Sequence, residues 1–277
     1  VCMMAGTASL PHVMMRYFTT PSVKAARRSV GWSLFFIFLL YSSAPMLATL
    51  SKLSLMDPNL PTGIIGKSIA DVQAIDWYQN WNQANLMFVS DFNGNGTLEL
   101  NEFFMGGKAV VLATPEVAGL PYVISGLVAA GGMAAAMSTA DGLVLAISNA
   151  LSHDIYYKMI NPKAETAKRL IVARVLLVII GFAGATIAAL EIQGILGSVI
   201  WAFDFAMSGL FFPLVLGVWW KRANAQGAVA GMLLGLISGS AYLIWVRNGG
   251  AGFWGVTQLT FGIVGSLVSL VSMIVVS

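Results

Sequence analysis

The sequence predicts an all-α integral membrane protein, and its composition and its layout both support that fold class. Hydrophobic residues make up 57% of the 277 residues and charged residues only 10%, whereas soluble domains carry about 25% charged residues. The apolar runs approach the roughly 20 residues that a helix needs to cross a bilayer and are too long for barrel strands. Because the basic residues lie between these runs, the net charge of +3 does not indicate nucleic-acid binding.

The first segment, residues 1–15, is apolar but is interrupted by residues that break or bend helices: Gly6, Thr7, Ser9 and Pro11. It is either a broken membrane helix, which is tolerated where it lines a cavity or is buried in protein, or an ordinary helix end. The given sequence starts and stops inside apolar runs, and its first residues show no start methionine, basic n-region or cleavage site. We therefore expect a C-terminal fragment that follows other helices of the same protein. A single cysteine, Cys2, excludes an intrachain disulfide.

The next membrane helix is expected over 31–50, with a kink at Pro45. A long, mostly polar excursion follows over 51–108, and then a short surface helix over 109–120. The later membrane helices are expected over these ranges: 129–153, 170–190, 195–219, 225–245 and onward from about 256. The fragment thus holds about six membrane helices, and its first segment is partial.

Basic residues are distributed unequally between the two sides of this alternating topology. One side collects 11 of the 15 lysines and arginines. The positive-inside rule assigns that side to the cytoplasm. The excursion 51–108 is then expected outside the cytoplasm.

Residues 129–156 carry polar side chains in the middle of an apolar stretch: Ser138, Thr139 and Asp141. A carboxylate at membrane depth costs roughly 3 kcal/mol on insertion scales, so it is rarely there without a polar partner or a water path. The surrounding glycines and alanines let neighbouring helices approach closely. The pattern predicts one wall of an ion or solute pathway. The alternative is a packing helix whose hydroxyl groups bond to their own backbone carbonyls.

This polar notch offers an ion site. Ser138 and Thr139 supply hydroxyl oxygens, and Ala135, one turn earlier, supplies a carbonyl oxygen if the helix loosens. Neutral oxygens of this kind suit a partly dehydrated monovalent cation. Asp141 lies one turn beyond Ser138, and Asp204 is a second acid inside a predicted membrane helix. Both acids are candidates for ion binding or proton handling, with structural hydrogen bonding as the alternative.

Four glycines recur every four residues in the predicted helix 225–245: Gly227, Gly231, Gly235 and Gly239. This spacing places them in one stripe, which predicts a close-packing face and no chemistry.

Residues 91–102, DFNGNGTLELNE, fit the twelve-residue calcium loop of an EF-hand, with glycine at position 6 and glutamate at position 12. The expected calcium ligands are Asp91, Asn93, Asn95, the Thr97 carbonyl, Glu99 and Glu102. The two asparagines lower the ligand charge, so we expect weak binding, on the order of 10⁻⁴–10⁻³ M. The alternative is a chance cluster of turn residues. Asn95 also opens a glycosylation sequon, and a glycan there would compete with the ligand role.

Several stretches resemble one known family. The stretch 217–237, GVWWKRANAQGAVAGMLLGLI, is similar to the signature of the sodium:solute symporter family, with its basic residue at Arg222. The stretches 6–20, 110–121 and 129–156 resemble the acetate-permease branch of cation/acetate symporters. The resemblance covers nearly the whole chain except the calcium-type loop, which looks like an insertion.

The resemblance implies a leucine-transporter-like fold of two inverted five-helix repeats. Residues 1–219 would then be the second repeat and 220–277 peripheral membrane helices. The family's sodium-ligand pattern, an alanine followed three and four residues later by hydroxyl residues, falls on Ala135, Ser138 and Thr139. Residues on the sixth core helix would lie near the substrate: Gly6, Thr7 and Ser9. The first core helix, with the other ligands, would precede this chain, so the fragment alone is not expected to transport.

The function expected from these observations is sodium-coupled symport of acetate or a similar small monocarboxylate, with no enzymatic reaction. Na⁺ is the expected coupling ion, and Ca²⁺ is a candidate ligand of the outer loop. The expected partners are the lipid bilayer of a bacterial inner membrane, a small carboxylate and the preceding helices of the same protein, but no nucleic acid. The alternatives are a symporter-fold membrane sensor with a calcium-responsive loop, a proton-coupled pathway and a passive channel.

Overall fold

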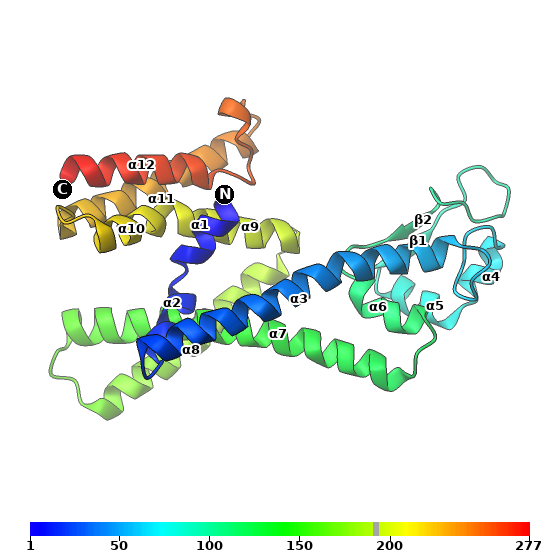
Figure 1. Cartoon of the computed structure of the whole chain (residues 1–277), viewed down its shortest axis with the longest axis horizontal. Coiled ribbons are helices and arrows are strands. Elements are labelled where there is room, and N and C mark those ends of the chain that lie inside the picture. Colours follow the sequence, from blue (N-terminus) through cyan, green and yellow to red (C-terminus); the bar gives the residue numbers. More distant parts are fainter. Residues whose placement is uncertain (191–193) are drawn as a thin grey trace. The chain divides into compact units, whose positions relative to one another are not determined.

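A computed structural model describes residues 1–190 and 194–277 of the chain, mostly as helices (Figure 1). The elements before residue 120 are α1 (Cys2–Ser9), α2 (Pro11–Phe18), α3 (Val23–Met56), α4 (Ile69–Gln73), α5 (Asp76–Gln83), β1 (Met87–Val89), β2 (Phe103–Met105) and α6 (Val110–Val117). Those after it are α7 (Tyr122–Asn149), η1 (Ala150–Ile160), α8 (Thr166–Ala189), α9 (Ile195–Ala206), η2 (Met207–Phe211), α10 (Phe212–Trp219), α11 (Ala225–Arg247), η3 (Phe253–Gly255) and α12 (Gly262–Val276). Here η1 and η2 are π-helices and η3 is a 3₁₀-helix.

The chain divides into two compact units. The first unit comprises residues 1–20 and 140–277, and the second comprises residues 21–139. The sequence-based boundary at residue 219 follows another criterion, the inverted repeat, and stays a prediction.

Five helical stretches of the described chain are long and apolar enough to cross a membrane: Val23–Met56, Tyr122–Ile160, Thr166–Ala189, Ile195–Trp219 and Ala225–Arg247. Each coincides, to within a residue, with one of the predicted spans or contains it. α12 has 15 residues, which gives a length of about 22 Å at 1.5 Å per residue, less than the roughly 30 Å of a hydrocarbon core. The all-α membrane class is confirmed.

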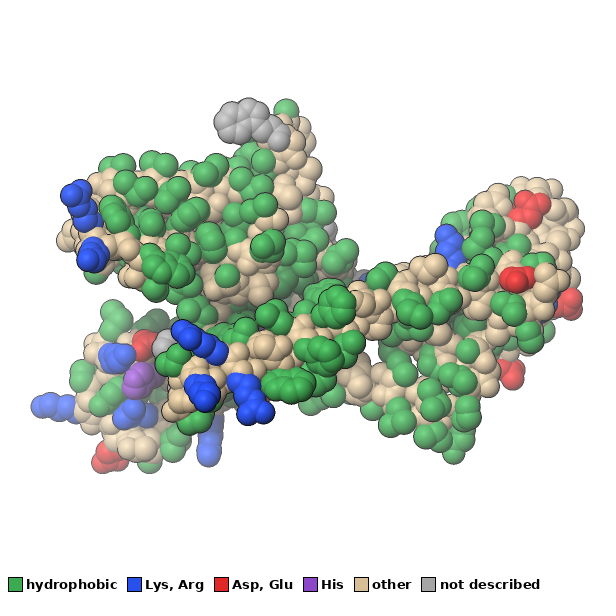
Figure 2. All heavy atoms as spheres, in the orientation of Figure 1, with side chains coloured by type: hydrophobic (Ala, Val, Ile, Leu, Met, Phe, Trp, Pro, Cys, Tyr) green, Lys and Arg blue, Asp and Glu red, His purple; other side chains and the backbone are tan. Residues whose placement is uncertain are grey.

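The second unit contains α3, whose middle is mostly apolar, with basic residues near its start and Lys52 near its end. Ser22 caps its start, since the Ser22 hydroxyl accepts a hydrogen bond from the Ala25 amide at 3.1 Å. Pro45 lies inside the helix without ending it. Large apolar side chains such as Phe36 and Phe38 are exposed, and hydrophobic atoms cover much of the surface in Figure 2. A helix that is hydrophobic all round belongs in a protein core or in lipid.

The excursion between α3 and α7 folds into a small subdomain with its own hydrophobic core, which the sequence analysis did not foresee. Its centre is formed by fully buried side chains: Ile64, Val72, Met87 and Leu98. β1 and β2 pair antiparallel, with Phe88 opposite Phe104. A short helix, α6, lies where one was predicted, but Pro115 does not interrupt it and one side of it, with Ala113 and Val117, is buried in this core. α6 is tied to α5 by a 2.9 Å hydrogen bond from the Trp81 indole to the Glu116 carboxylate.

In the first unit, α11 and α12 pack side by side (Figure 1) and η2 packs on both. The four glycines of α11 are all buried. A side chain at Gly235 would collide with the Ser208 carbonyl and would lie 2.8 Å from Cβ of Ser269. The predicted packing face is therefore present.

Tyr242 fixes the turn that follows α11. Its hydroxyl donates to the Val256 carbonyl at 2.9 Å and accepts from the Phe253 amide at 3.0 Å. We expect Tyr242→Phe to lower the free energy of unfolding by about 1–3 kcal/mol, because two partners lose their hydrogen bond. Thermal unfolding of the full-length protein measures this. Tyr122→Phe is the matched control, since Tyr122 is 87% exposed, and an equal effect of both changes would contradict the assignment.

Candidate functional site

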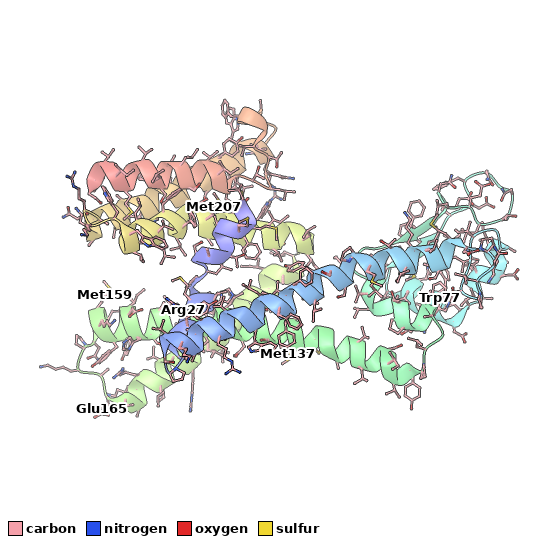
Figure 3. All side chains as sticks on the ribbon, in the orientation of Figure 1. Arg27, Trp77, Met137, Met159, Glu165 and Met207 are labelled. Carbon is pink, nitrogen blue, oxygen red and sulfur yellow. The ribbon has the colours of Figure 1, made fainter. Side chains whose placement is uncertain are left out.

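The polar notch lies on α7, where Met137, labelled in Figure 3, immediately precedes Ser138. The Thr139 hydroxyl donates to the Ala135 carbonyl at 3.3 Å. Ala135, Ser138 and Thr139 are all exposed in this chain. Thr139 thus makes the backbone bond that the alternative interpretation expected, and it also places two of the three candidate ion ligands next to each other.

The backbone of α7 does not loosen at Ala135. The helix stays α-helical from Tyr122 to Asn149 and changes to a π-helix only at Ala150. The Ala135 carbonyl oxygen therefore belongs to a regular helical turn and not to an unwound one. Asp141, one turn beyond Ser138, is exposed on the same α-helix.

The π-helix η1 is a feature that sequence reasoning missed. The Ser148 hydroxyl, just before it, donates to the Ala173 carbonyl of α8 at 2.8 Å. Arg169 of α8 lies over the Tyr157 ring at 3.7 Å from its centre, and its guanidinium is 3.5 Å from Nδ1 of His153. These contacts fasten the end of the notch-bearing helix to α8. No residue pattern distinguishes a π-helix from an α-helix, because only the hydrogen-bond register changes.

The first segment is a broken helix, as one of the two interpretations predicted. α1 ends at Ser9, Leu10 is extended, and α2 restarts at Pro11. The Ser9 hydroxyl donates to the carbonyls of Ala5 and Gly6, and the Thr7 hydroxyl donates to the Met3 carbonyl at 2.6 Å. Both hydroxyls are thus satisfied by their own helix.

Gly6 is buried against α9, where an added Cβ would lie 2.7 Å from Cβ of Phe203. Gly6 therefore serves helix packing in this chain. The substrate-proximal role of Gly6, Thr7 and Ser9 stays a prediction.

Asp204 on α9 is fully buried, and neither of its carboxyl oxygens has a hydrogen-bond partner among the described residues. The backbone carbonyl of Asp204 is occupied, since the Ser208 hydroxyl donates to it at 2.7 Å. Most buried polar groups in proteins are hydrogen-bonded, so an exception requires an explanation.

The calcium-type loop has the local geometry that its spacing predicts. The Asp91 carboxylate accepts hydrogen bonds from the amides of Gly94 and Gly96 at 2.7 and 3.1 Å. Gly94 and Gly96 both have positive φ, at 71° and 70°, which glycine adopts without strain. Glu102 at position 12 is fully buried, and its two oxygens accept from the amides of Phe92 and Glu99 at 2.9 and 3.0 Å.

The loop is anchored to the subdomain through position 8. Leu98 is fully buried, its amide donates to the Lys67 carbonyl, and its carbonyl accepts from the Gly66 amide, both at 2.8 Å. The remaining candidate ligands contact one another, since the side-chain amides of Asn93 and Asn95 donate to Glu99 at 2.9 and 3.1 Å. Across the described residues, no three His, Cys, Asp or Glu side chains are gathered to hold a metal. The structure thus gives a folded loop but not a preformed acidic cage.

A half-open cavity of about 420 Å³ lies in the second unit between the end of α3 and β2. Its lining is apolar except for two side chains, Ser51 and Lys52. None of the candidate site residues lines it.

Comparison with known proteins tests the family resemblance. Residues 107–235 match the model of the sodium:solute symporter family. The chain belongs to the sodium:solute symporter family. The matched part of this symporter family member runs from α6 into α11, so it includes both the notch on α7 and Asp204. It excludes the calcium-type loop and the broken first helix.

Two curated relatives extend this symporter comparison. The chain is 44% identical over 245 residues to an uncharacterized symporter of Cupriavidus necator, covering 88% of this chain and 35% of that protein. It is 28% identical over 235 residues to a monocarboxylic acid transporter of Corynebacterium glutamicum, covering 84% of this chain and 35% of that protein. The chain thus spans about a third of the length of the curated relatives it matches. Both relatives are named as transporters and not as enzymes.

Proposed function

We propose that this chain is part of a secondary transporter that couples sodium to the symport of acetate or a similar small monocarboxylate. The observation that carries the proposal is the oxygen notch of α7, which lies inside the segment that matches the symporter family. The similarity to a monocarboxylic acid transporter supports the class of solute. We place the protein in the plasma membrane of a bacterium, with the subdomain between α3 and α7 outside the cytoplasm.

In this proposal, Ala135, Ser138 and Thr139 hold the sodium ion. The Thr139 hydroxyl oxygen and the Ala135 carbonyl oxygen are 3.3 Å apart, which is short enough for one small cation to touch both. Exposure of the notch in this chain leaves room for further ligands from other helices of the full-length protein. Sodium bound there would favour one arrangement of the helices, so that its gradient drives solute uptake.

Uptake of labelled acetate by the full-length protein in proteoliposomes tests the proposal. We expect an inward sodium gradient to drive accumulation above the external concentration, and a potassium gradient of equal size to fail. Competition by propionate and pyruvate, with a neutral amide as control, then defines the solute class. Acetate accumulation that does not depend on the sodium gradient would contradict the coupling. Acetate that only reaches equal concentrations on both sides of the membrane would indicate a passive pathway.

A second candidate function is calcium binding by the loop 91–102. The specific observation in its favour is Glu102, whose two oxygens are buried inside the loop at the position that binds calcium bidentately. Asp91 and the two positive-φ glycines give the loop its turn. On calcium binding, Glu99 would give up its hydrogen bonds from the Asn93 and Asn95 side-chain amides and would bind the ion instead. We expect a dissociation constant no lower than about 10⁻⁴ M.

We expect calcium at several millimolar to raise the melting temperature of the full-length protein, and Asp91→Ala to abolish that rise. Differential scanning fluorimetry with calcium or magnesium measures it. Asp57→Ala is the matched control, because Asp57 also accepts a backbone hydrogen bond, from Asn59 at 2.9 Å, but lies outside the loop. An equal calcium response in both variants would contradict the calcium site.

A further inference from the structure

Asp204 is the strongest unexplained group in the molecule. It lies on α9, within the apolar stretch Ile195–Trp219 that is long enough to span a membrane. The residue is 0% exposed, and both carboxyl oxygens lack hydrogen-bond partners within the described part of the chain. An ionised carboxylate buried without a partner is far less stable than the neutral acid, which needs no counter-ion.

Few charged or titratable side chains lie on the elements that pack against α9. α1 contributes one titratable group, the Cys2 thiol, and η2 and α12 contribute none. α11 contributes Tyr242, whose hydroxyl is bonded to Val256, and Arg247, whose guanidinium lies 5.6 Å from the ring centre of Trp201 and forms no ion pair with Asp204. The amino group of Val1 also acts on Asp204, but it is charged only where a polypeptide begins at this residue.

The space around the carboxyl is closed on two sides. Gly262, the first residue of α12, packs against the carboxyl group. An added Cβ at Gly262 would lie 2.8 Å from Oδ1 of Asp204. On the α1 side, Cys2 and Ala5 pack with Met207 of η2 in a buried cluster (Met207 is labelled in Figure 3). The Cys2 thiol points to the Thr260 carbonyl at 4.0 Å. The oxygens named nearby are already engaged, since the Ser208 hydroxyl donates to the Asp204 backbone carbonyl and the Thr260 carbonyl faces the Cys2 thiol. A dehydrated sodium ion requires a shell of several free oxygens, whereas a proton needs only one carboxyl oxygen.

We propose that Asp204 is a proton-binding site of the transporter, loaded while α1 is packed on α9 and exchanged with water when α1 separates from it. Loading forms one O–H bond between a carboxylate oxygen and a proton from water, and release breaks that bond. α1 is suited to such a movement because it is a short helix that ends at the break before Pro11. α1 contacts α9 where Gly6 packs against Phe203, and Phe203 immediately precedes Asp204 in the sequence. This inference goes beyond sodium coupling, because it concerns another site and another ion.

Infrared difference spectroscopy of the full-length protein in lipid tests the proton directly. We expect wild type at neutral pH to show the carbonyl band of a protonated carboxylic acid. Asp204→Asn should lose that band, and the matched control Asp71→Asn, which changes an exposed aspartate of α4, should keep it. Asp204→Glu should retain a band at a shifted frequency, which separates loss of the proton site from loss of the fold. An Asp204→Asn spectrum identical to wild type would overturn the proposal, and so would a band that sodium removes at constant pH.

Transport supplies the second readout. In proteoliposomes without a sodium gradient, we expect an inward proton gradient to increase solute uptake by wild type at least about threefold and to leave uptake by Asp204→Asn unchanged. Solute exchange at equal pH on both sides should persist in Asp204→Asn, because it requires no net proton movement. A proton response that persists in Asp204→Asn would contradict the site. Failure of sodium-driven uptake alone would count against the proposed function and not against Asp204.

Discussion

Replacing Ser138 and Thr139 together by alanine raises the sodium concentration for half-maximal acetate uptake at least about tenfold. Each lost hydroxyl removes a neutral oxygen from the ion, and a polar contact to a charged group is worth about 1.5–3 kcal/mol, where 1.4 kcal/mol corresponds to a factor of ten. The Ala135 carbonyl stays in place, because it belongs to the backbone of a regular helix. Uptake in the presence of saturating sodium should recover most of the wild-type rate.

The matched control for that double change is Ser125→Ala, on the same helix but nearer its start. Its sodium dependence should equal that of wild type. Thr139→Ser is a second control, since it keeps the hydroxyl that donates to Ala135 and should change the half-maximal concentration less than Thr139→Ala. If the double alanine variant lost the maximal rate at all sodium concentrations while its half-maximal concentration stayed fixed, the notch would be a packing feature.

Gly235→Leu is expected to destabilise the α11–α12–η2 packing more than any other change considered. The new side chain would meet the backbone oxygens of Ser208 and Gly265, which lie on two different elements. Overpacking a close-packed interior costs about 1–3 kcal/mol when side chains can move, and backbone atoms yield less readily. We expect the yield of folded full-length protein to fall severalfold and its melting temperature to drop clearly.

Gly184→Leu in α8 is the control, because an added Cβ there meets nothing within 4 Å in the described chain. It should stay close to wild type in size-exclusion profile and melting temperature. The reverse order of the two variants would show that the glycine stripe is not the packing face of α11. Because Ser208 also bonds to the backbone of Asp204, the same disruption should reach the carboxyl site.

The membrane helices could be predicted from the sequence because their signal is local. An apolar run bounded by basic or turn residues contains the information for a span, and five of the predicted spans match, to within a residue, helical stretches long enough to cross a membrane. The turn geometry of residues 91–102 is also a local property, whereas calcium binding by this loop stays a prediction. Asp91, Gly96 and Glu102 act within twelve consecutive residues, so their spacing alone specifies the turn.

Other features depend on contacts between distant residues and could not be predicted. The subdomain core brings Ile64, Met87 and Leu98 together from separate segments of a region whose sequence is mostly polar. Asp204 was recognisable as an acid in an apolar helix. Its burial depends on α1 and α12, which bring Cys2 and Gly262 beside it from distant parts of the chain.

The notch on α7 could be predicted only in part from the sequence. The pattern of Ala135, Ser138 and Thr139 located the oxygens correctly on one helix, and the bond between Thr139 and Ala135 follows from helical spacing. The helix is not loosened at Ala135, the condition under which its carbonyl would be free to bind an ion, and that carbonyl accepts a hydrogen bond from the Thr139 hydroxyl. Where the helix does change register, at η1, the change is linked to contacts with α8.

Equilibrium binding of radioactive sodium to the purified full-length protein tests the central claim most directly, since it requires neither a solute nor a gradient. The account predicts saturable sodium binding by wild type that choline does not displace, and binding at least about tenfold weaker in the Ser138→Ala, Thr139→Ala double variant. Equal sodium affinity in the two proteins would contradict a sodium site at this notch.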